Sequence, residues 1–173
     1  WYDAPLAKSP QDCYPSLVIE VVFMAQTRPA TPADIPVLVE FWYERALLQQ
    51  TRLAADARER WTRAALKLLE SRDAAMFVGL DGEEQLIGYV TCQIQPSPPG
   101  TLPEQQGVIG EIAIDAHHYH EGTGRLLVGA AREWFHSRAI DHFIVLVSQR
   151  SAVEQAFWRG LGAVKWMEIL WIK

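Results

Sequence analysis

Apolar residues recur at helical spacing in two segments of the first half of the chain. The first begins at Thr31-Pro32, a hydroxyl residue and a proline that suit the first turn of a helix. Its apolar residues fall on one helix face: Ile35, Leu38, Val39, Trp42 and Ala46. A second apolar stripe of the same period runs from Ala57 to Leu68. The pattern therefore predicts two amphipathic helices in succession.

After these helices the pattern changes to that of strands. Residues 75–80 and 86–94 are strand-like runs separated by Asp81-Gly82-Glu83-Glu84, which favours an antiparallel hairpin. Residues 108–114 predict a further strand. Residues 143–147 are a continuous apolar run, typical of a central strand that is covered on both faces. Residues 164–172 predict the last strand.

Two more helices are expected among these later strands. Gly122-Thr123-Gly124 opens the first of them, and residues 151–161 form the second. Ser151 suits the start of that helix and Gly162 its end. The order of elements predicts a mixed α/β sheet in one domain.

The first 23 residues do not fit this scheme. They contain the apolar run Leu17-Val18-Ile19-Glu20-Val21-Val22-Phe23 directly before Met24, without the basic start and cleavage site of a signal peptide. Two interpretations of residues 1–23 stay open. They are an extension, from upstream or added artificially, with Met24 as the native start, or they are an extra strand that packs on the domain or on a second chain. Residues 24–173 form the domain.

The composition is that of an ordinary globular protein and reduces the range of possible binding partners. Of 173 residues, 49% are hydrophobic and 21% are charged, enough for one sizeable core. The net charge of −5, without a dense lysine or arginine patch, argues against nucleic acid and suits a cationic small substrate. No apolar run is long enough to span a bilayer, and two cysteines cannot build a disulfide framework. We therefore expect a cytoplasmic protein without membrane contact, with Cys92 as a buried structural thiol.

Gly122-Thr123-Gly124 is the segment that indicates chemistry. Glycines allow a tight turn that approaches a ligand closely, and the free N–H groups of a first helical turn can bind phosphate. A plain tight turn fits the same residues. The dinucleotide fingerprint GxGxxG is not met, because Leu127 stands at its third glycine, and there is no GKS or GKT of a P-loop. Both common nucleotide motifs are disfavoured.

Residues 111–124 resemble the acetyl-coenzyme A motif of GNAT N-acetyltransferases. The motif [Q/R]-x-x-G-x-[G/A] maps onto Tyr119-His120-Glu121-Gly122-Thr123-Gly124, after a strand of the form E-hydrophobic-x-[V/I] at Glu111-Ile112-Ala113-Ile114. Further family phrases follow the right order at residues 27–35, 86–90 and 157–163. The likeness covers residues 24–173, and this order is more specific than any single motif.

The resemblance implies a mixed, mostly antiparallel central sheet, splayed in the middle and flanked by about four helices. It also implies transfer of an acetyl group from acetyl-CoA to a primary amine of a small molecule or peptide. Pantetheine would enter beside the strand that ends at Ile114, pairing with backbone groups of Ile112, Ile114 and Ala116. Ser151 would lie near the pantetheine arm. The pyrophosphate would lie on the turn formed by Tyr119, His120, Glu121, Gly122, Thr123, Gly124 and Arg125.

Two departures from the family pattern bear on activity. Tyr119 stands at the Q/R position, which costs a side-chain contact but leaves the backbone amides. Trp158 stands where the family has a tyrosine that protonates the leaving thiolate. An indole N–H is a donor only and does not supply that proton. An alternative therefore stays open: a catalytically silent acyl-CoA-binding module that acts as a sensor or scaffold.

The expected reaction is direct attack of a neutral amine on the thioester carbonyl. An amine is mostly protonated near neutral pH, so a base must take its proton, and Glu111 is the candidate. The other interpretation of Glu111 is a structural carboxylate paired with an arginine. Trp42 and Tyr43 are candidates for the acceptor pocket. The histidines of residues 117–120 are interpreted as loop residues without a metal, and one of them near the pyrophosphate or as an alternative base stays open. The acceptor amine and the oligomeric state, a homodimer included, stay open.

Overall fold

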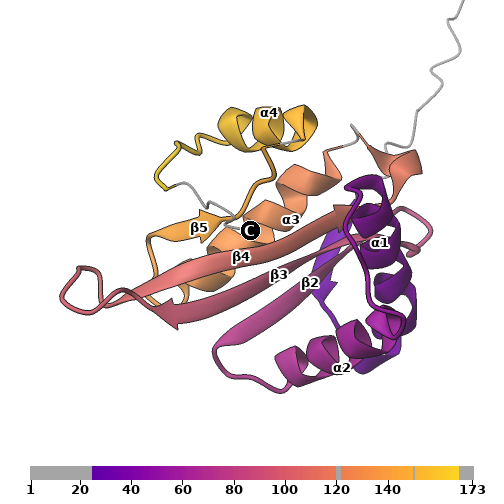
Figure 1. Ribbon diagram of the computed structural model, residues 1–173, viewed down its shortest axis with the longest axis horizontal. Coiled ribbons are helices and arrows are strands. Elements are labelled where there is room, and N and C mark those ends of the chain that lie inside the picture. The colour runs from indigo at the N-terminus through magenta and orange to yellow at the C-terminus, as the bar shows by residue number, and fades with distance from the viewer. Residues whose placement is uncertain (1–24, 120–121, 150, 168–173) are drawn as a thin grey trace, which may run out of the picture.

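The computed structural model describes residues 25–119, 122–149 and 151–167. Within these ranges, five strands form one sheet in the order β1-β2-β3-β4-β5, with four α-helices packed around it (Figure 1). The strands are Gln26–Pro29 (β1), Ala74–Leu80 (β2), Leu86–Pro96 (β3), Gln105–Ile114 (β4) and Phe143–Val145 (β5). The helices are Ile35–Leu48 (α1), Ala57–Leu69 (α2), Thr123–His136 (α3) and Ala152–Gly160 (α4).

The sheet is antiparallel from β1 to β4, and only β5 runs parallel to its neighbour. The predicted hairpin joins β2 to β3. In its turn, the Asp81 side chain accepts hydrogen bonds from the backbone N–H groups of Glu83 and Gln85, both at 2.8 Å. The prediction of a mixed, mostly antiparallel sheet with four flanking helices is confirmed.

Two apolar cores lie on the two faces of the sheet. The core under α1 and α2 holds the fully buried Tyr89, and the core under α3 and α4 holds its neighbour Val90. This alternation is what a strand with both faces covered requires. Full burial of one large apolar side chain contributes about 1.5–3 kcal/mol, so both helix layers are stabilised by packing on the sheet.

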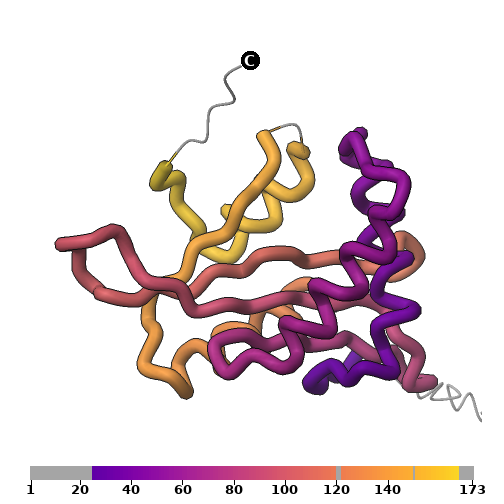
Figure 2. The backbone as a smooth tube through the Cα atoms, turned by 60° about the horizontal axis from the view of Figure 1, so that its bottom comes forward, coloured from indigo at the N-terminus to yellow at the C-terminus, as the bar shows by residue number. Residues whose placement is uncertain are grey.

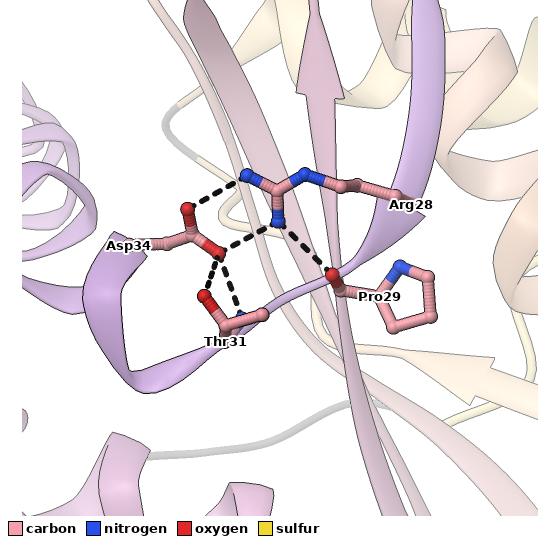
Figure 3. Close-up of polar contacts among 4 residues, drawn as sticks. All are labelled: Arg28, Pro29, Thr31 and Asp34. Atoms are coloured by element: carbon pink, nitrogen blue, oxygen red, sulfur yellow. Dashed lines mark hydrogen bonds and ion pairs between the residues drawn. The ribbon is translucent and has the colours of Figure 1, made fainter.

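The chain turns from β1 into α1 through a short 3₁₀-helix, Pro32–Asp34, at the position that the sequence predicted (Figure 3). The backbone N–H and the hydroxyl of Thr31 both donate to the Asp34 carboxylate, at 2.7 and 2.9 Å. Arg28 at the end of β1 donates to both carboxylate oxygens, each at 2.8 Å. Asp34 therefore links the strand, the turn and the helix.

The expectation of a central, doubly covered strand over residues 143–147 is not met among the described residues. The strand ends at Val145, and β5 is the edge strand of the described sheet, half-buried throughout. One face alone packs on the core, through Phe143, Val145 and Val147, which is enough to require an apolar sequence. The last expected strand is wrong for residues 164–167, which have no regular structure, and its remainder lies outside the described residues.

Residues 1–24 also lie outside the described part of the chain, together with both interpretations of the N-terminal segment. None of the helices that the structure describes has the length and apolar character that crossing a bilayer requires.

Candidate active site

The middle of β4 carries a β-bulge. The pairing of β3 with β4 shifts by one residue between Val90 and Cys92, so that Gly110 and Glu111 both lie opposite Thr91. The Thr91 hydroxyl oxygen accepts the backbone N–H of Glu111 at 2.9 Å. A buried side chain thus satisfies a backbone donor at the point where the ladder is interrupted.

The bulge decides which way Glu111 points. In an unbroken strand Glu111 would share a face with Ile109, which is fully buried under α3 and α4. The extra residue turns Glu111 to the opposite face, where Ala113 packs in the core of α1 and α2. The carboxylate therefore avoids an apolar core in which its charge would have no partner.

The strands β4 and β5 part at the same point. They pair over three residues only, from Gly107 with Phe143 to Ile109 with Val145, whereas β4 continues to Ile114. After β5 the chain rises away from β4 toward α4 (Figure 2). Among the described residues, no strand lies beside the outer half of β4 on this side. The predicted splay in the middle of the sheet is confirmed.

Helix α3 begins beside the end of β4. Gly122 has a φ of 87°, a left-handed conformation that glycine adopts without steric cost. Gly124 is buried, and a Cβ atom there would lie 3.0 Å from the Phe157 ring and 3.1 Å from the Ile114 side chain. Glycine therefore lets β4, α3 and α4 come together closely. The free N–H groups of this first turn, with the positive end of the helix dipole behind them, can hold a phosphate.

The other residues of this turn differ in burial. Thr123 is 1% exposed, and its hydroxyl oxygen has no hydrogen-bond partner among the described residues. Arg125 is exposed and, with Gly122, lines a surface hollow of about 410 Å³ along α3. Tyr119 is 46% exposed. His120 and Glu121 lie outside the described residues.

Asp115 organises the loop between β4 and this turn. Its side chain accepts the backbone N–H of His117 at 3.2 Å and lies 3.0 Å from Nδ1 of His118. Both contacts stabilise the 3₁₀-helix Ala116–His118. In the part of the chain that the structure describes, no three His, Cys, Asp or Glu side chains gather as they would around a metal ion.

Glu111 is half-buried and receives two hydrogen bonds on one oxygen. The indole N–H of Trp61 donates to Oε2 at 3.1 Å and the hydroxyl of Tyr89 donates to it at 3.0 Å. Oε1 has no hydrogen-bond partner among residues 25–119, 122–149 and 151–167, and no arginine there forms an ion pair with this carboxylate. Burial, and next the charge of Glu111, raise the pKa of Tyr89 well above its usual value, so its hydroxyl stays a donor.

An aromatic group surrounds this carboxylate. Trp61 stacks on Trp42 with ring centroids 5.8 Å apart and meets the edge of Tyr89 at 5.7 Å. Of the two predicted acceptor residues, Trp42 thus belongs to the group at Glu111. Tyr43 instead carries the guanidinium of Arg58 on its ring, 3.4 Å from the centroid.

Sequence reasoning missed Trp61 and Tyr89 as site residues. Trp61 lies within the apolar stripe predicted from Ala57 to Leu68, and Tyr89 lies within the strand predicted over residues 86–94. The signal that could have identified them is their polar tip, because a buried indole N–H or phenol usually finds an acceptor.

A groove of about 570 Å³ runs between α2 and the sheet and reaches this carboxylate. Trp61 and Ala64 line it from α2, and Thr91 lines it from β3. Gly110 and Glu111, the two residues of the bulge, line it from β4. The bulge of β4 and the Glu111 carboxylate therefore both lie at this groove.

Ser151 and Trp158 have structural contacts in α4. The Ser151 hydroxyl accepts the backbone N–H of Glu154 at 3.2 Å and so caps the helix. Glu154 in turn accepts from Arg45 and Gln49 of α1, at 3.1 and 2.7 Å, which ties the two helix layers together. Trp158 is 5% exposed and packs in the core under α4.

Cys92 is fully buried in the same core, as expected for a structural thiol. Burial raises the pKa of Cys92 to about 12, so the thiol stays protonated and is a poor nucleophile. Cys92 is therefore not a candidate nucleophile.

Comparison with known proteins agrees with this fold. Among solved structures, the chain is similar to an aminoglycoside antibiotic 6'-N-acetyltransferase from Acinetobacter haemolyticus, with a TM-score of 0.71, 17% identity, and 86% of this chain and 97% of that chain covered. It is also similar to a predicted acetyltransferase with acetyl-CoA from Clostridium acetobutylicum, with a TM-score of 0.73, 16% identity and coverage of 87% and 96%. No curated protein matches the sequence. Residues 40–163, more than half of the chain, match the model of the Acetyltransferase (GNAT) family. The chain therefore belongs to the GNAT family of acetyltransferases.

Proposed function

We propose that this protein transfers the acetyl group of acetyl-CoA to a primary amine, with Glu111 as the base that takes the proton of the amine. The observation that carries the proposal is the bulge of β4. At this one point β4 leaves β5, and Glu111 turns toward a groove with one carboxylate oxygen unoccupied among the described residues.

The chain offers suitable groups for acetyl-CoA, which supplies the acetyl thioester when it is bound. The outer edge of β4, at Ile112 and Ile114 with Ala116 beyond it, pairs with no strand in the described part of the chain, and its backbone groups suit an amide-bearing arm. The amides around Gly122 and Thr123 suit a diphosphate, and the close packing at Gly124 suits a backbone cradle. Arg125 beside this turn adds a positive charge, whereas Ser151 serves as a helix cap and has at most a secondary contact.

The role of Glu111 follows from its contacts. Trp61 and Tyr89 fix Oε2 and leave Oε1 as the oxygen that accepts a proton from the ammonium. The two donors are neutral, so neither forms an ion pair with the carboxylate, and a cationic amine is its natural partner. Removal of the proton would free the nitrogen lone pair for attack on the thioester carbonyl, so that the C–N bond forms as the C–S bond breaks. CoA would leave as the thiolate, and the second proton that the nitrogen loses would pass to that thiolate or to water.

A second candidate function is favoured by Trp158. This residue lies in the core, 5% exposed, and an indole supplies no proton to a leaving thiolate. A GNAT domain without that acid could bind acyl-CoA without turnover, as a sensor or scaffold.

The test combines calorimetric binding of acetyl-CoA with thiol release over a panel of primary amines. We expect binding of acetyl-CoA and saturable thiol release with at least one amine. Binding without thiol release for every amine would favour the sensor or scaffold. Failure to bind acetyl-CoA would contradict both functions.

A further inference from the structure

We propose that the groove between α2 and the sheet is the acceptor site, and that it selects amines with a single positive charge on an elongated, uncharged body. The proposal rests on the proposed function for the reaction that occurs there. The shape of the groove and its binding preference, however, follow from the residues that line it.

The inner end of the groove is built around the carboxylate. Gly110 is exposed in the middle of β4, and a Cβ atom there would lie 3.0 Å from the Thr91 hydroxyl oxygen. Glycine thus keeps the floor open beside Glu111. Trp61 forms the wall and also donates to Glu111, so wall and carboxylate hold fixed positions relative to each other. An amine that reaches the end of the groove meets Oε1.

The charges of the lining favour a single cation. The charged side chains of the groove are Glu111, Asp73 and Lys67. When Glu111 pairs with the reacting ammonium, Asp73 and Lys67 carry opposite charges that cancel. A second ammonium would lose hydration without gaining a net negative partner, and an unpaired desolvated charge is costly.

The uncharged lining determines the body of the ligand. Ala64 and Leu68 offer apolar surface on the helix side, and Trp61 adds an aromatic ring. Thr91 and Gln93 offer hydrogen-bonding groups on the sheet side. A volume of about 570 Å³ lies within the usual range for small-molecule sites. An arylalkylamine such as 2-phenylethylamine fits these features, and spermidine is a longer, polycationic amine for comparison.

The first experiment fills the groove from α2. Ala64 is exposed and lines the groove, so Ala64→Trp narrows the groove without altering a core position. Leu66→Trp is the matched control, because Leu66 is 37% exposed on the same helix and does not line the groove. We expect Ala64→Trp to raise the KM for 2-phenylethylamine about tenfold or more, with the KM for acetyl-CoA unchanged and the control like wild type. An active Ala64→Trp enzyme with an unchanged amine KM would overturn the groove proposal and leave acetyl transfer intact.

The second experiment needs no turnover. The indole N–H signal of Trp61 in an NMR spectrum of the labelled protein, assigned by its loss in Trp61→Phe, is followed during titration with each amine. We expect a saturable shift with 2-phenylethylamine at a concentration about tenfold lower than with spermidine at equal ionic strength. No shift with either amine would overturn the site, and equal or tighter binding of spermidine would overturn the single-charge preference. A saturable shift without any thiol release would support the groove and contradict the proposed reaction.

Discussion

Asp34 and Glu111 are two partly or fully buried carboxylates that the fold holds in opposite ways. Both oxygens of Asp34 are occupied: Arg28 donates to each, and Thr31 donates twice to Oδ2. The Arg28 hydrogen bond, against the opposing effect of burial, lowers the pKa of Asp34 to about 2. Glu111 has two neutral donors on one oxygen, while its other oxygen has no partner in the described part of the chain.

This difference in hydrogen bonding distinguishes a structural carboxylate from a candidate catalytic one, and it needs no sequence motif. A carboxylate saturated by a cation and by backbone donors holds a chain turn in place and has no capacity left to take a proton. A carboxylate with one free oxygen on a groove keeps that capacity, and its neutral donors orient it without cancelling its charge. Substitution of each carboxylate by its amide removes the charge and preserves the shape, so the effects at Glu111 and Asp34 can be compared.

The largest effect is expected for Glu111→Gln. A general base contributes about 10²–10⁴-fold to the rate, so kcat for thiol release should fall by at least about 100-fold. The fold should persist, because the amide oxygen of glutamine still accepts from Trp61 and Tyr89. Binding of acetyl-CoA should stay unchanged. Glu104→Gln, at an exposed position before β4, is the control, and a Glu111→Gln rate within threefold of wild type would exclude the base role.

The second effect concerns stability. Asp34→Asn should lower the free energy of unfolding at pH 7 by about 2 kcal/mol, which is the value of a pKa drop from 3.8 to about 2. Since the folded pKa lies below the unfolded one, this contribution is complete above about pH 5 and is lost as the pH falls through 4 toward 2.

Urea unfolding of wild type and Asp34→Asn between pH 7 and pH 2.5 measures this difference. The two stabilities should converge at the acid end. Asp56→Asn is the control, because its pair with Arg60 is exposed and screened by solvent, so that little change in stability is expected. A stability gap of constant size across the whole pH range would contradict the assignment.

Local patterns predicted those parts of the fold that local physics determines. The helical stripe from Ile35 to Ala46 and the turn at Asp81 depend on neighbours a few residues away, and both are present as predicted. The position of β5 could not be predicted, because a strand with one face on a core and a strand covered on both faces can have the same apolar sequence. Phe143 and Val145 give no sign of which neighbour lies beside them.

In the site, as in the fold, local features could be predicted from the sequence and contacts between distant residues could not. The turn at Gly122 is a local feature of glycine, so its sequence indicated an anion site that stays a prediction. The bulge was hidden, because Gly110 has no side chain whose polarity could reveal the face it occupies. Trp61 and Tyr89 contact Glu111 across 50 and 22 positions of sequence, and such contacts depend on how helices and strands pack.

The smallest effect, and the most specific, is expected for Tyr89→Phe. The substitution removes one of two donors from Oε2 and keeps the ring that packs in the core, so kcat should fall about three- to tenfold with little change in the amine KM. If the hydroxyl acts by positioning the carboxylate, the same substitution in a Glu111→Gln background should have almost no further effect on the rate. Rates of the four proteins in this cycle measure the coupling. An equal loss in both backgrounds would mean that the Tyr89 hydroxyl acts through packing, and the orientation of Glu111 would then depend on Trp61 and the bulge alone.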